Sequence, residues 1–181
     1  MTTTILLARH GETDWNAQRR VQGHSDTPLN ETGRAQARAL ADELADAPLD
    51  AVYSSDLSRA HETARIVAER KGLPVRTLPE LREKHFGTWE GLTDEEVWER
   101  YPESLQGQWG DGETGEEVSR RVLAALRTIA AEHPGGRVLV VAHGGPLRLV
   151  LKHCQVEANG PIANCHVVRI EARDGALRSV D

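Results

Sequence analysis

The sequence predicts an α/β protein, a three-layer α/β/α sandwich around a mainly parallel central sheet. Short apolar runs alternate along the chain with longer segments of helical periodicity. This alternation is typical of a sheet with helices on both faces. Two of the apolar runs, 5–8 and 138–142, lead into a histidine followed by glycine. Open α/β sheets place their chemistry beyond the carboxyl ends of their strands, so these histidines are candidate functional residues.

The N-terminal half is expected to hold three strands and two helices. The expected elements are a strand at 2–8, a polar loop at 14–28, a helix from Thr32 to about Ala47, a strand at 49–53, a helix with caps at 54–56 that ends at 72–74, and a short strand at 75–78. Leu40 and Leu44 fall on one face of the first helix, and Pro48 ends it.

The C-terminal half begins with irregular chain and then returns to strands and helices. The expected elements are an irregular segment at 79–112 with one acidic helix near 93–101, a long helix at 113–133, a buried strand at 138–142, a helix from 144 to about 153, and a hairpin of strands at 167–172 and 176–180. Asp174-Gly175 is a favoured turn for such a hairpin.

Length and composition indicate one globular domain, 1–181. A chain of 181 residues can bury one full core and is short for two domains. It has 22 Lys and Arg against 28 Asp and Glu, which gives a formal net charge of −6. This acidic balance argues against a nucleic-acid partner, because such proteins usually present a basic face.

Targeting and redox signals predict a cytoplasmic protein. The apolar runs are too short to span a membrane. Residues 1–4 lack the basic start and apolar core of a signal peptide. Cys154 and Cys165 are too few for a disulfide framework and lack metal-ligand spacing, so reduced thiols are expected. The oligomeric state is not readable from the sequence, which allows a homodimer.

His10, at the end of the first strand, is the first candidate catalytic residue. Gly11 removes a Cβ beside the imidazole, so backbone or ligand can approach closely. Arg9 adds a fixed positive charge with a planar fork of donors that suits phosphate oxygens. Nearby guanidinium groups favour the neutral imidazole, which is the nucleophilic form. On this motif alone, a structural histidine with one hydrogen bond explains the pattern equally well.

His143 repeats the same local pattern 133 residues later. Two strands that each deliver a histidine to one sheet edge would bring the two imidazoles close together. Arg59 follows a third strand and falls in the first turn of a helix, where a cation does not complement the helix dipole. A bound anion would favour a cation at this position.

Further motifs lie in one order along nearly the whole chain. They are Arg9-His10-Gly11-Glu12-Thr13-Asp14-Trp15-Asn16, Gln22-Gly23, Asp26, Pro28-Leu29, Thr32-Gly33-Arg34-Ala35-Gln36-Ala37, Ser54-Ser55-Asp56-Leu57-Ser58-Arg59-Ala60, Thr63-Ala64, Leu81-Arg82-Glu83, Gly87-Thr88-Trp89-Glu90-Gly91, Gly112-Glu113-Thr114, and His143-Gly144-Gly145 with Arg148. This set resembles the histidine phosphatase superfamily, which includes the phosphoglycerate mutases and many small bacterial phosphatases. The chain departs from the family at Asn164-Cys165-His166, where members often have Asn-x-Ser. The departure puts the local hydrogen bonding in doubt and touches no catalytic position.

The resemblance implies a phosphoglycerate mutase-like fold and a role for each matching position. His10 would be phosphorylated on Nε2, while its Nδ1–H donates to a backbone carbonyl. Arg9, Arg59 and His143 would surround the phosphoryl oxygens. Glu83 would be the general acid for the leaving oxygen and then the general base for water. The residues expected to bind substrate are Arg9, Asn16, Gln22, Gly23, Arg59 and Gly144. No metal and no cofactor is implied.

Residues 84–115 would form a cap-like insertion over this site and bear on the choice of reaction. Family mutases carry a longer insertion with extra cations, whereas this segment has only Lys84 and Arg100 and many acidic side chains. An acidic segment suits a bisphosphorylated sugar acid poorly. We therefore predict a phosphomonoester hydrolase that acts on a small phosphorylated metabolite. Phosphoglycerate mutase activity and a non-catalytic phosphate-binding role are the alternatives. The sequence does not separate a broad-specificity phosphatase from a ribazole-phosphate or a sugar-phosphate phosphatase.

Overall fold

A six-stranded sheet forms the centre of the computed structural model, which describes residues 1–106, 109–158 and 160–180. The strand order is β3-β2-β4-β1-β5-β6. The strands are β1 (Thr3–Arg9), β2 (Ala51–Ser54), β3 (Val75–Thr77), β4 (Arg137–Ala142), β5 (Val167–Arg173) and β6 (Ala176–Ser179). The four strands β3, β2, β4 and β1 run parallel, while the β5–β6 hairpin is antiparallel. The predicted mainly parallel sheet with a final hairpin is confirmed.

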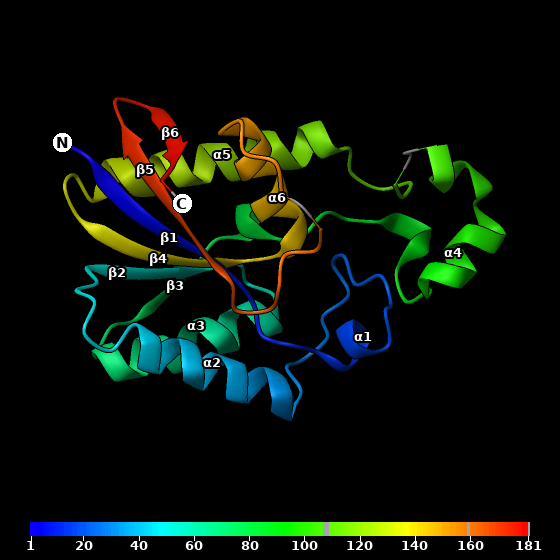
Figure 1. The fold of residues 1–181 in the computed structure, drawn as a ribbon, viewed down its shortest axis with the longest axis horizontal. Coiled ribbons are helices and arrows are strands. Elements are labelled where there is room, and N and C mark those ends of the chain that lie inside the picture. Colours follow the sequence, from blue (N-terminus) through cyan, green and yellow to red (C-terminus); the bar gives the residue numbers. More distant parts are fainter. Residues whose placement is uncertain (107–108, 159, 181) are drawn as a thin grey trace.

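Helices cover both faces of this sheet, as Figure 1 shows. On one face lie α2 (Glu31–Glu43) and α3 (Ser58–Lys71); on the other lie α5 (Gly115–Glu132) and α6 (Gly144–His153). Side chains alternate between faces along a strand. Leu6 and Ala8 therefore pack with α2 and α3, whereas Ile5 and Leu7 pack with α5 and α6. The three-layer α/β/α sandwich is confirmed.

The register of β1 and β4 brings their ends to the same point. Arg9 pairs with Ala142, and the backbone N–H of His10 donates to the Ala142 carbonyl at 3.0 Å. Each strand is followed directly by a histidine: His10 follows β1, and His143 follows β4. Because the strands are parallel, both histidines leave the sheet at its carboxyl edge.

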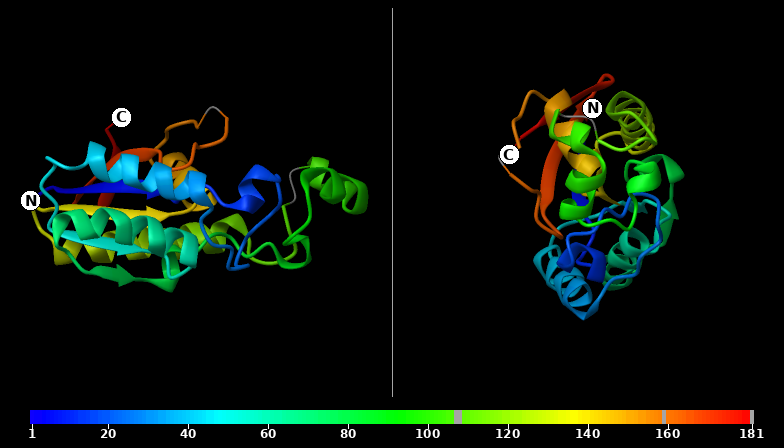
Figure 2. Two further views of the ribbon diagram at one scale, coloured as in Figure 1. Left: turned by 90° about the horizontal axis from the view of Figure 1, so that it is seen from below. Right: turned by 90° about the vertical axis from the view of Figure 1, so that its right-hand side faces the viewer.

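Short helices gather beyond this carboxyl edge. Figures 1 and 2 show α1 (Asp14–Ala17) and α4 (Asp94–Arg100) at the end of the molecule opposite the N-terminus. Three 3₁₀ turns complete the region: η1 (Pro79–Leu81), η2 (Gly87–Trp89) and η3 (Pro102–Gln106). The expected acidic helix is thus present. That residues 84–115 act as a cap within a single domain stays a prediction.

Three helix starts differ from the prediction. The polar loop at 14–28 contains α1, which begins at a capping box between Thr13 and Asn16. Helix α2 is capped by Asn30, whose side chain accepts from the Gly33 N–H, and not by Thr32. The N-cap of α3 is Leu57, without a side-chain cap.

A residue from a distant loop caps α3 instead of the predicted residues 54–56. The Asp26 carboxylate accepts from the backbone N–H of Ser58 at 2.7 Å, 32 positions along the chain. Asp56 is bound by Arg82 through two hydrogen bonds, at 2.7 and 2.6 Å. The prediction that residues 54–56 cap this helix is therefore wrong, because Asp56 is engaged by Arg82 and the distant Asp26 reaches the first N–H of the helix.

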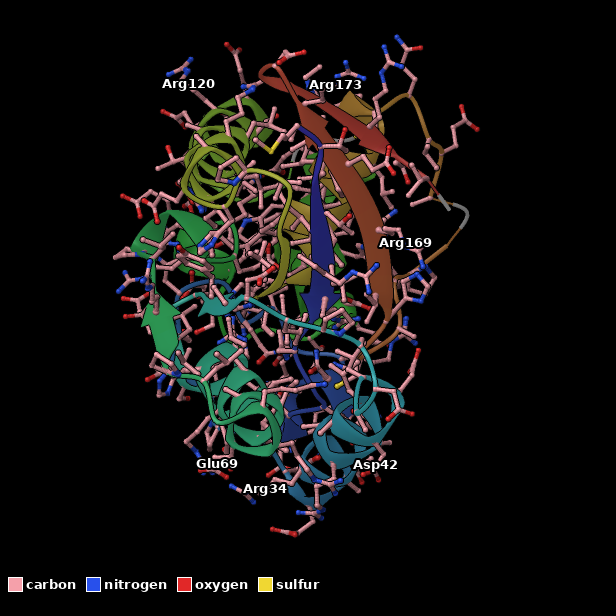
Figure 3. All side chains as sticks on the ribbon, turned by 90° about the vertical axis from the view of Figure 1, so that its left-hand side faces the viewer. Arg34, Asp42, Glu69, Arg120, Arg169 and Arg173 are labelled. Atoms are coloured by element: carbon pink, nitrogen blue, oxygen red, sulfur yellow. The ribbon has the colours of Figure 1, made fainter. Side chains whose placement is uncertain are left out.

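The outer faces of the helices are charged. Figure 3 shows Asp42 on α2 and Glu69 on α3 at the surface of the molecule. Within the described residues, none of the helices is both long enough and apolar enough to cross a membrane.

Candidate active site

The two histidines that leave the sheet lie side by side in the interior. The ring centroids of His10 and His143 are 5.1 Å apart, with an interplanar angle of 60°. Their exposed fractions are 3 % and 0 %. The predicted juxtaposition of two imidazoles at one sheet edge is confirmed.

The tautomer of His10 follows from its hydrogen bond. Its Nδ1 lies 2.6 Å from the Gly11 carbonyl oxygen. A carbonyl can only accept, so Nδ1 carries the proton and Nε2 keeps its lone pair. Burial, followed by the charges of Arg59 and Arg9, holds the pKa of His10 well below its ordinary value. A neutral imidazole with a free Nε2 is a competent nucleophile.

Gly11 is required by the backbone of α2. A Cβ at Gly11 would lie 2.5 Å from the carbonyl oxygen of Gly33. The group that closely approaches Gly11, as expected, is therefore the backbone of Gly33 in the same chain. The Gly11 N–H also donates to the Thr63 hydroxyl at 3.0 Å, and this hydroxyl donates to the Arg59 carbonyl at 2.7 Å. These contacts join the His10 turn to the helix that carries Arg59.

Arg59 is a fully buried cation held by two backbone carbonyls. Its exposed fraction is 1 %. Nη1 donates to the Ser25 carbonyl at 2.9 Å and Nη2 to the Gly23 carbonyl at 2.8 Å. Gly23 and Ser25 belong to a loop that Glu90 holds in place. The Glu90 carboxylate accepts from the backbone N–H groups of His24 and Ser25, both at 2.9 Å.

Unpartnered polar atoms converge around His10. Seven buried side-chain nitrogen and oxygen atoms have no hydrogen-bond partner within the described residues. Four of them belong to three candidate residues: Nε of Arg9, Nε of Arg59, and Nδ1 and Nε2 of His143. Buried donors are normally satisfied because an unpaired one costs about 1–3 kcal/mol. Donors that lie beside a neutral imidazole in this way suit the oxygens of a bound anion.

We use the word cage for the four residues Arg9, His10, Arg59 and His143. The charges of this cage favour a negatively charged ligand. Burial lowers the pKa of Arg9, and it lowers the pKa of Arg59 to about 10, so both guanidinium groups remain charged at neutral pH. Burial, with the charge of Arg59 next, holds the pKa of His143 well below its ordinary value. The cage therefore combines two cations with two neutral rings.

Glu83 supplies the carboxylate beside the cage. Its charge is the largest influence that opposes burial in the pKa shifts of both Arg9 and Arg59. Oε1 accepts from the Lys84 N–H at 2.8 Å, and Oε2 accepts from the Gly145 N–H at 3.1 Å. A Cβ at Gly145 would collide with Glu83 Oε1, so any other residue here would push this carboxylate out of its present position.

The other predicted substrate-binding residues surround the cage in different ways. Gly144 opens α6, whose first N–H groups have no partner within the helix. The Gln22 side-chain oxygen accepts from the Thr13 hydroxyl at 2.9 Å. The Asn16 oxygen accepts from the Thr13 N–H at 3.1 Å, while Gly23 contributes its carbonyl to Arg59. Asn16, Gln22 and Gly23 thus support the site through protein contacts.

Residues 164–166, where the chain departs from the family pattern, form hydrogen bonds with the end of β1. The Asn164 side chain donates to the His10 carbonyl at 3.0 Å, and the Cys165 N–H donates to the Arg9 carbonyl at 3.1 Å. The His166 carbonyl accepts from the Arg9 N–H at 3.0 Å. Burial raises the pKa of the Cys165 thiol to about 12, so this cysteine stays protonated. The doubt about local hydrogen bonding is resolved, because backbone groups make most of these contacts.

The sequence did not reveal the roles of Glu90, Glu113 and Arg121. Glu90 and Glu113 lie in recognised motifs but carried no predicted function. Arg121 lies on the long helix α5, where an arginine normally faces solvent. For the two carboxylates, their position in motifs was a signal in the sequence that they have a role. No such signal marked Arg121, because its hydrogen-bond partners are 8 to 41 positions away.

The fold and the cage define an α/β protein with two cations and two buried, neutral imidazoles at the carboxyl edge of its sheet, an arrangement that suits an oxyanion. The model of the family described as histidine phosphatase superfamily (branch 1) matches residues 5–181. The chain therefore belongs to the histidine phosphatase superfamily.

Relatives within this family point to phosphatase activity. The chain is 40 % identical to an Arabidopsis thaliana metal-independent phosphoserine phosphatase over 95 % of its own length and 77 % of that protein. It is 37 % identical to the probable phosphoglycerate mutase GpmB of Enterobacter sp. (strain 638), over 94 % of this chain and 85 % of that protein. The solved structure of a mycobacterial glucosyl-3-phosphoglycerate phosphatase is 30 % identical, with a TM-score of 0.89 over 99 % of this chain and 98 % of that one.

Proposed function

We propose that this protein hydrolyses phosphomonoesters of small metabolites through a phosphohistidine on His10, without a metal ion. The carrying observation is the set of buried, unpartnered donors on Arg9, Arg59 and His143 beside a neutral imidazole. Fixed donors and cations take the place that a metal's charge would have in neutralising phosphoryl oxygens. The Arabidopsis thaliana relative is named a metal-independent phosphoserine phosphatase, which supports the same choice.

The first half-reaction forms the phosphoenzyme. The lone pair on Nε2 of His10 attacks phosphorus as the bond from phosphorus to the ester oxygen breaks. Protonated Glu83 gives its proton to the departing oxygen, which leaves as an alcohol. Arg9, Arg59 and His143 stabilise the charge on the three non-bridging oxygens during this in-line transfer. The Gly11 carbonyl keeps the Nδ1 proton in place and orients the ring.

The second half-reaction returns the enzyme to its starting state. Water attacks phosphorus, and the Glu83 carboxylate takes a proton from that water. The bond from phosphorus to Nε2 breaks, which releases inorganic phosphate and neutral His10. One carboxyl group thus serves as acid and then as base, so each turnover leaves its protonation unchanged.

Hydrolysis is favoured over mutase activity by the charges around the acid. Residues 84–115 hold only Lys84 and Arg100 as cations against eight acidic residues. Few cations are therefore available to keep a phosphorylated product in place while it is turned around. Water is then the better acceptor.

The decisive experiment is a phosphate-release screen with EDTA present. We expect turnover of phosphoserine, sugar phosphates or related monoesters, with competitive inhibition by vanadate and inorganic phosphate. Loss of activity on chelation, restored by a divalent ion, would contradict the metal-free site. Interconversion of 2- and 3-phosphoglycerate without phosphate release would identify a mutase instead. A cytoplasmic location and a homodimer stay predictions from the sequence.

A further inference from the structure

Arg121 on α5 holds the chain segment that carries Glu83. Its Nη1 donates to the carbonyls of Glu80 and Arg82, each at 2.7 Å, and its Nη2 donates to the Glu83 carbonyl at 2.8 Å. The side chain is 19 % exposed. One guanidinium thus fixes three backbone carbonyls within four residues.

Glu113 extends this network to the other side of Glu83. Its carboxylate accepts from Nε and Nη2 of Arg121, both at 2.8 Å, and from the His85 N–H at 2.8 Å. Burial alone would raise the pKa of Glu113, but the hydrogen bonds from Arg121 and His85 lower it overall. Glu113 therefore remains ionised at neutral pH and binds the chain just after Glu83.

The hydrogen bonds of Arg121 distinguish it from the arginines of the cage. All five N–H donors of its guanidinium are satisfied by Glu80, Arg82, Glu83 and Glu113. Arg9 and Arg59 each keep an unpartnered Nε that a ligand can use. Arg121 has no donor left for substrate, so it can act on the reaction only through the segment it holds and through its charge, which also lowers the pKa of His143 and which Arg121→Lys keeps.

This segment controls the direction of the Glu83 carboxylate. The Glu83 side chain accepts from the N–H of the next residue, Lys84, at 2.8 Å. The orientation of that N–H depends on the peptide plane that includes the Glu83 carbonyl, which Arg121 binds. A shift of this plane would turn the carboxylate away from the leaving oxygen.

We propose that Arg121 and Glu113 are positioning residues that aim Glu83 at the leaving oxygen. The inference rests on the proposed role of Glu83 as general acid and base. The conservative variants are Arg121→Lys, which cannot reproduce the planar fork, and Glu113→Gln, which keeps the shape and removes the charge. The matched control is Arg120→Ala, the adjacent residue on α5. Arg120 lies at the outer surface in Figure 3 and pairs only with exposed Glu116, at 3.3 Å, among the described contacts.

The test compares leaving groups in the rate of phosphoenzyme formation, measured by rapid quench. Alkyl phosphates need protonation of the departing oxygen, whereas p-nitrophenyl phosphate does not. Arg121→Lys and Glu113→Gln should each slow the step by about 10²-fold with alkyl phosphates, since small misplacements of catalytic groups have effects of this size. With p-nitrophenyl phosphate the loss should be a few-fold at most, and KM should change little. Arg120→Ala should leave both rates unchanged.

A double-mutant cycle with Glu83→Gln separates positioning from general loss of structure. Once the acid is gone, Arg121→Lys should slow alkyl-phosphate turnover by less than about threefold further. Losses that multiply instead, or equal losses for both leaving groups, would overturn the inference while leaving the role of Glu83 intact. If Glu83→Gln itself shows no dependence on the leaving group, the role of Glu83 and the inference fail together. If Arg121→Lys does not fold, Glu113→Gln gives the same comparison.

Discussion

The cage and the segment that carries Glu83 differ in how their polar side chains are held. Cage residues keep polar atoms without protein partners, whereas the carboxylates of the segment are hydrogen-bonded by the protein. The cage lies at the ends of two parallel strands and a helix, is buried, and contains polar atoms without protein partners. In the described part of the segment at 79–115, 3₁₀ turns and irregular chain flank the short helix α4, and Glu83 and Glu113 are half-buried. Their carboxylates accept hydrogen bonds from the protein on several sides.

This difference assigns different parts of the reaction to the two regions. Unpartnered donors on a rigid scaffold are prepared for the phosphoryl oxygens, which every phosphomonoester shares. A carboxylate held through long-range contacts serves the leaving group, which differs between substrates. Damage to the cage should therefore slow all substrates alike, whereas damage to the Glu83 segment should depend on the leaving group.

The largest effect is expected for His10→Ala. The variant lacks the nucleophile, so turnover should be abolished for alkyl and aryl phosphates alike. The wild-type protein should trap label from substrate as an acid-labile, base-stable phosphohistidine, detected after rapid quenching. More than a few per cent of residual activity in the variant would contradict the assignment.

Glu83→Gln should have the next largest effect, and only on poor leaving groups. Loss of a general acid lowers the rate by roughly 10²–10⁴-fold, so alkyl phosphates should show losses in this range. Formation of the phosphoenzyme from p-nitrophenyl phosphate should fall far less. Glutamine cannot activate water, so this phosphoenzyme should accumulate as a burst. Equal losses in the phosphorylation step would show that Glu83 positions substrate.

Arg59→Lys tests the cage with a charge-conserving change. Lysine keeps the charge but cannot hold the carbonyls of Gly23 and Ser25 and present a third donor in one plane. Loss of one preorganised donor typically lowers kcat by about 10²–10³-fold. The loss should be the same for alkyl and aryl phosphates, with weaker inhibition by vanadate as an independent readout. A loss confined to alkyl phosphates would erase the distinction between the two regions.

Local patterns in the sequence predicted the cage almost completely. A strand that ends in histidine and glycine is visible within ten residues, and parallel pairing then brings His10 and His143 together. The same reasoning placed Arg59 in the first turn of its helix. These features follow from the alternation of strands and helices, which a single sequence displays, and from the parallel pairing that this alternation implies.

The hydrogen bonds that hold the Glu83 segment could not be predicted from local patterns in the sequence. The five donors of Arg121 reach partners across sequence separations of 8 to 41 positions. The cap of α3 likewise comes from Asp26, not from the neighbouring Asp56. In each case several residues could have made the contact, and only the tertiary packing selects one.

The smallest expected effect is on stability, and it separates the two regions by pH. Burial lowers the pKa of His10 and His143 in the folded state, whereas the unfolded histidines titrate near about 6.5. Below that pH the unfolded chain binds more protons, so stability should fall as the pH drops from about 7 to 5. Each group contributes at most about 1.4 kcal/mol per pH unit.

The carboxylates of Glu90 and Glu113 behave differently. Burial alone would raise their pKa, but hydrogen bonds lower it overall in the folded state. Their contribution to stability is therefore present above the unfolded value near about 4.3, and it is lost as the pH falls through the folded pKa. Urea unfolding followed from pH 7 down to about pH 2 should show one decline that begins near the unfolded histidine value and a second one below about 4.3. His10→Gln should make the first decline shallower, because only His143 of the pair remains, and leave the second unchanged, while Glu113→Gln should make only the second shallower. A wild-type midpoint that stays constant between pH 7 and 5 would show that the imidazoles of the cage are not held neutral by the fold.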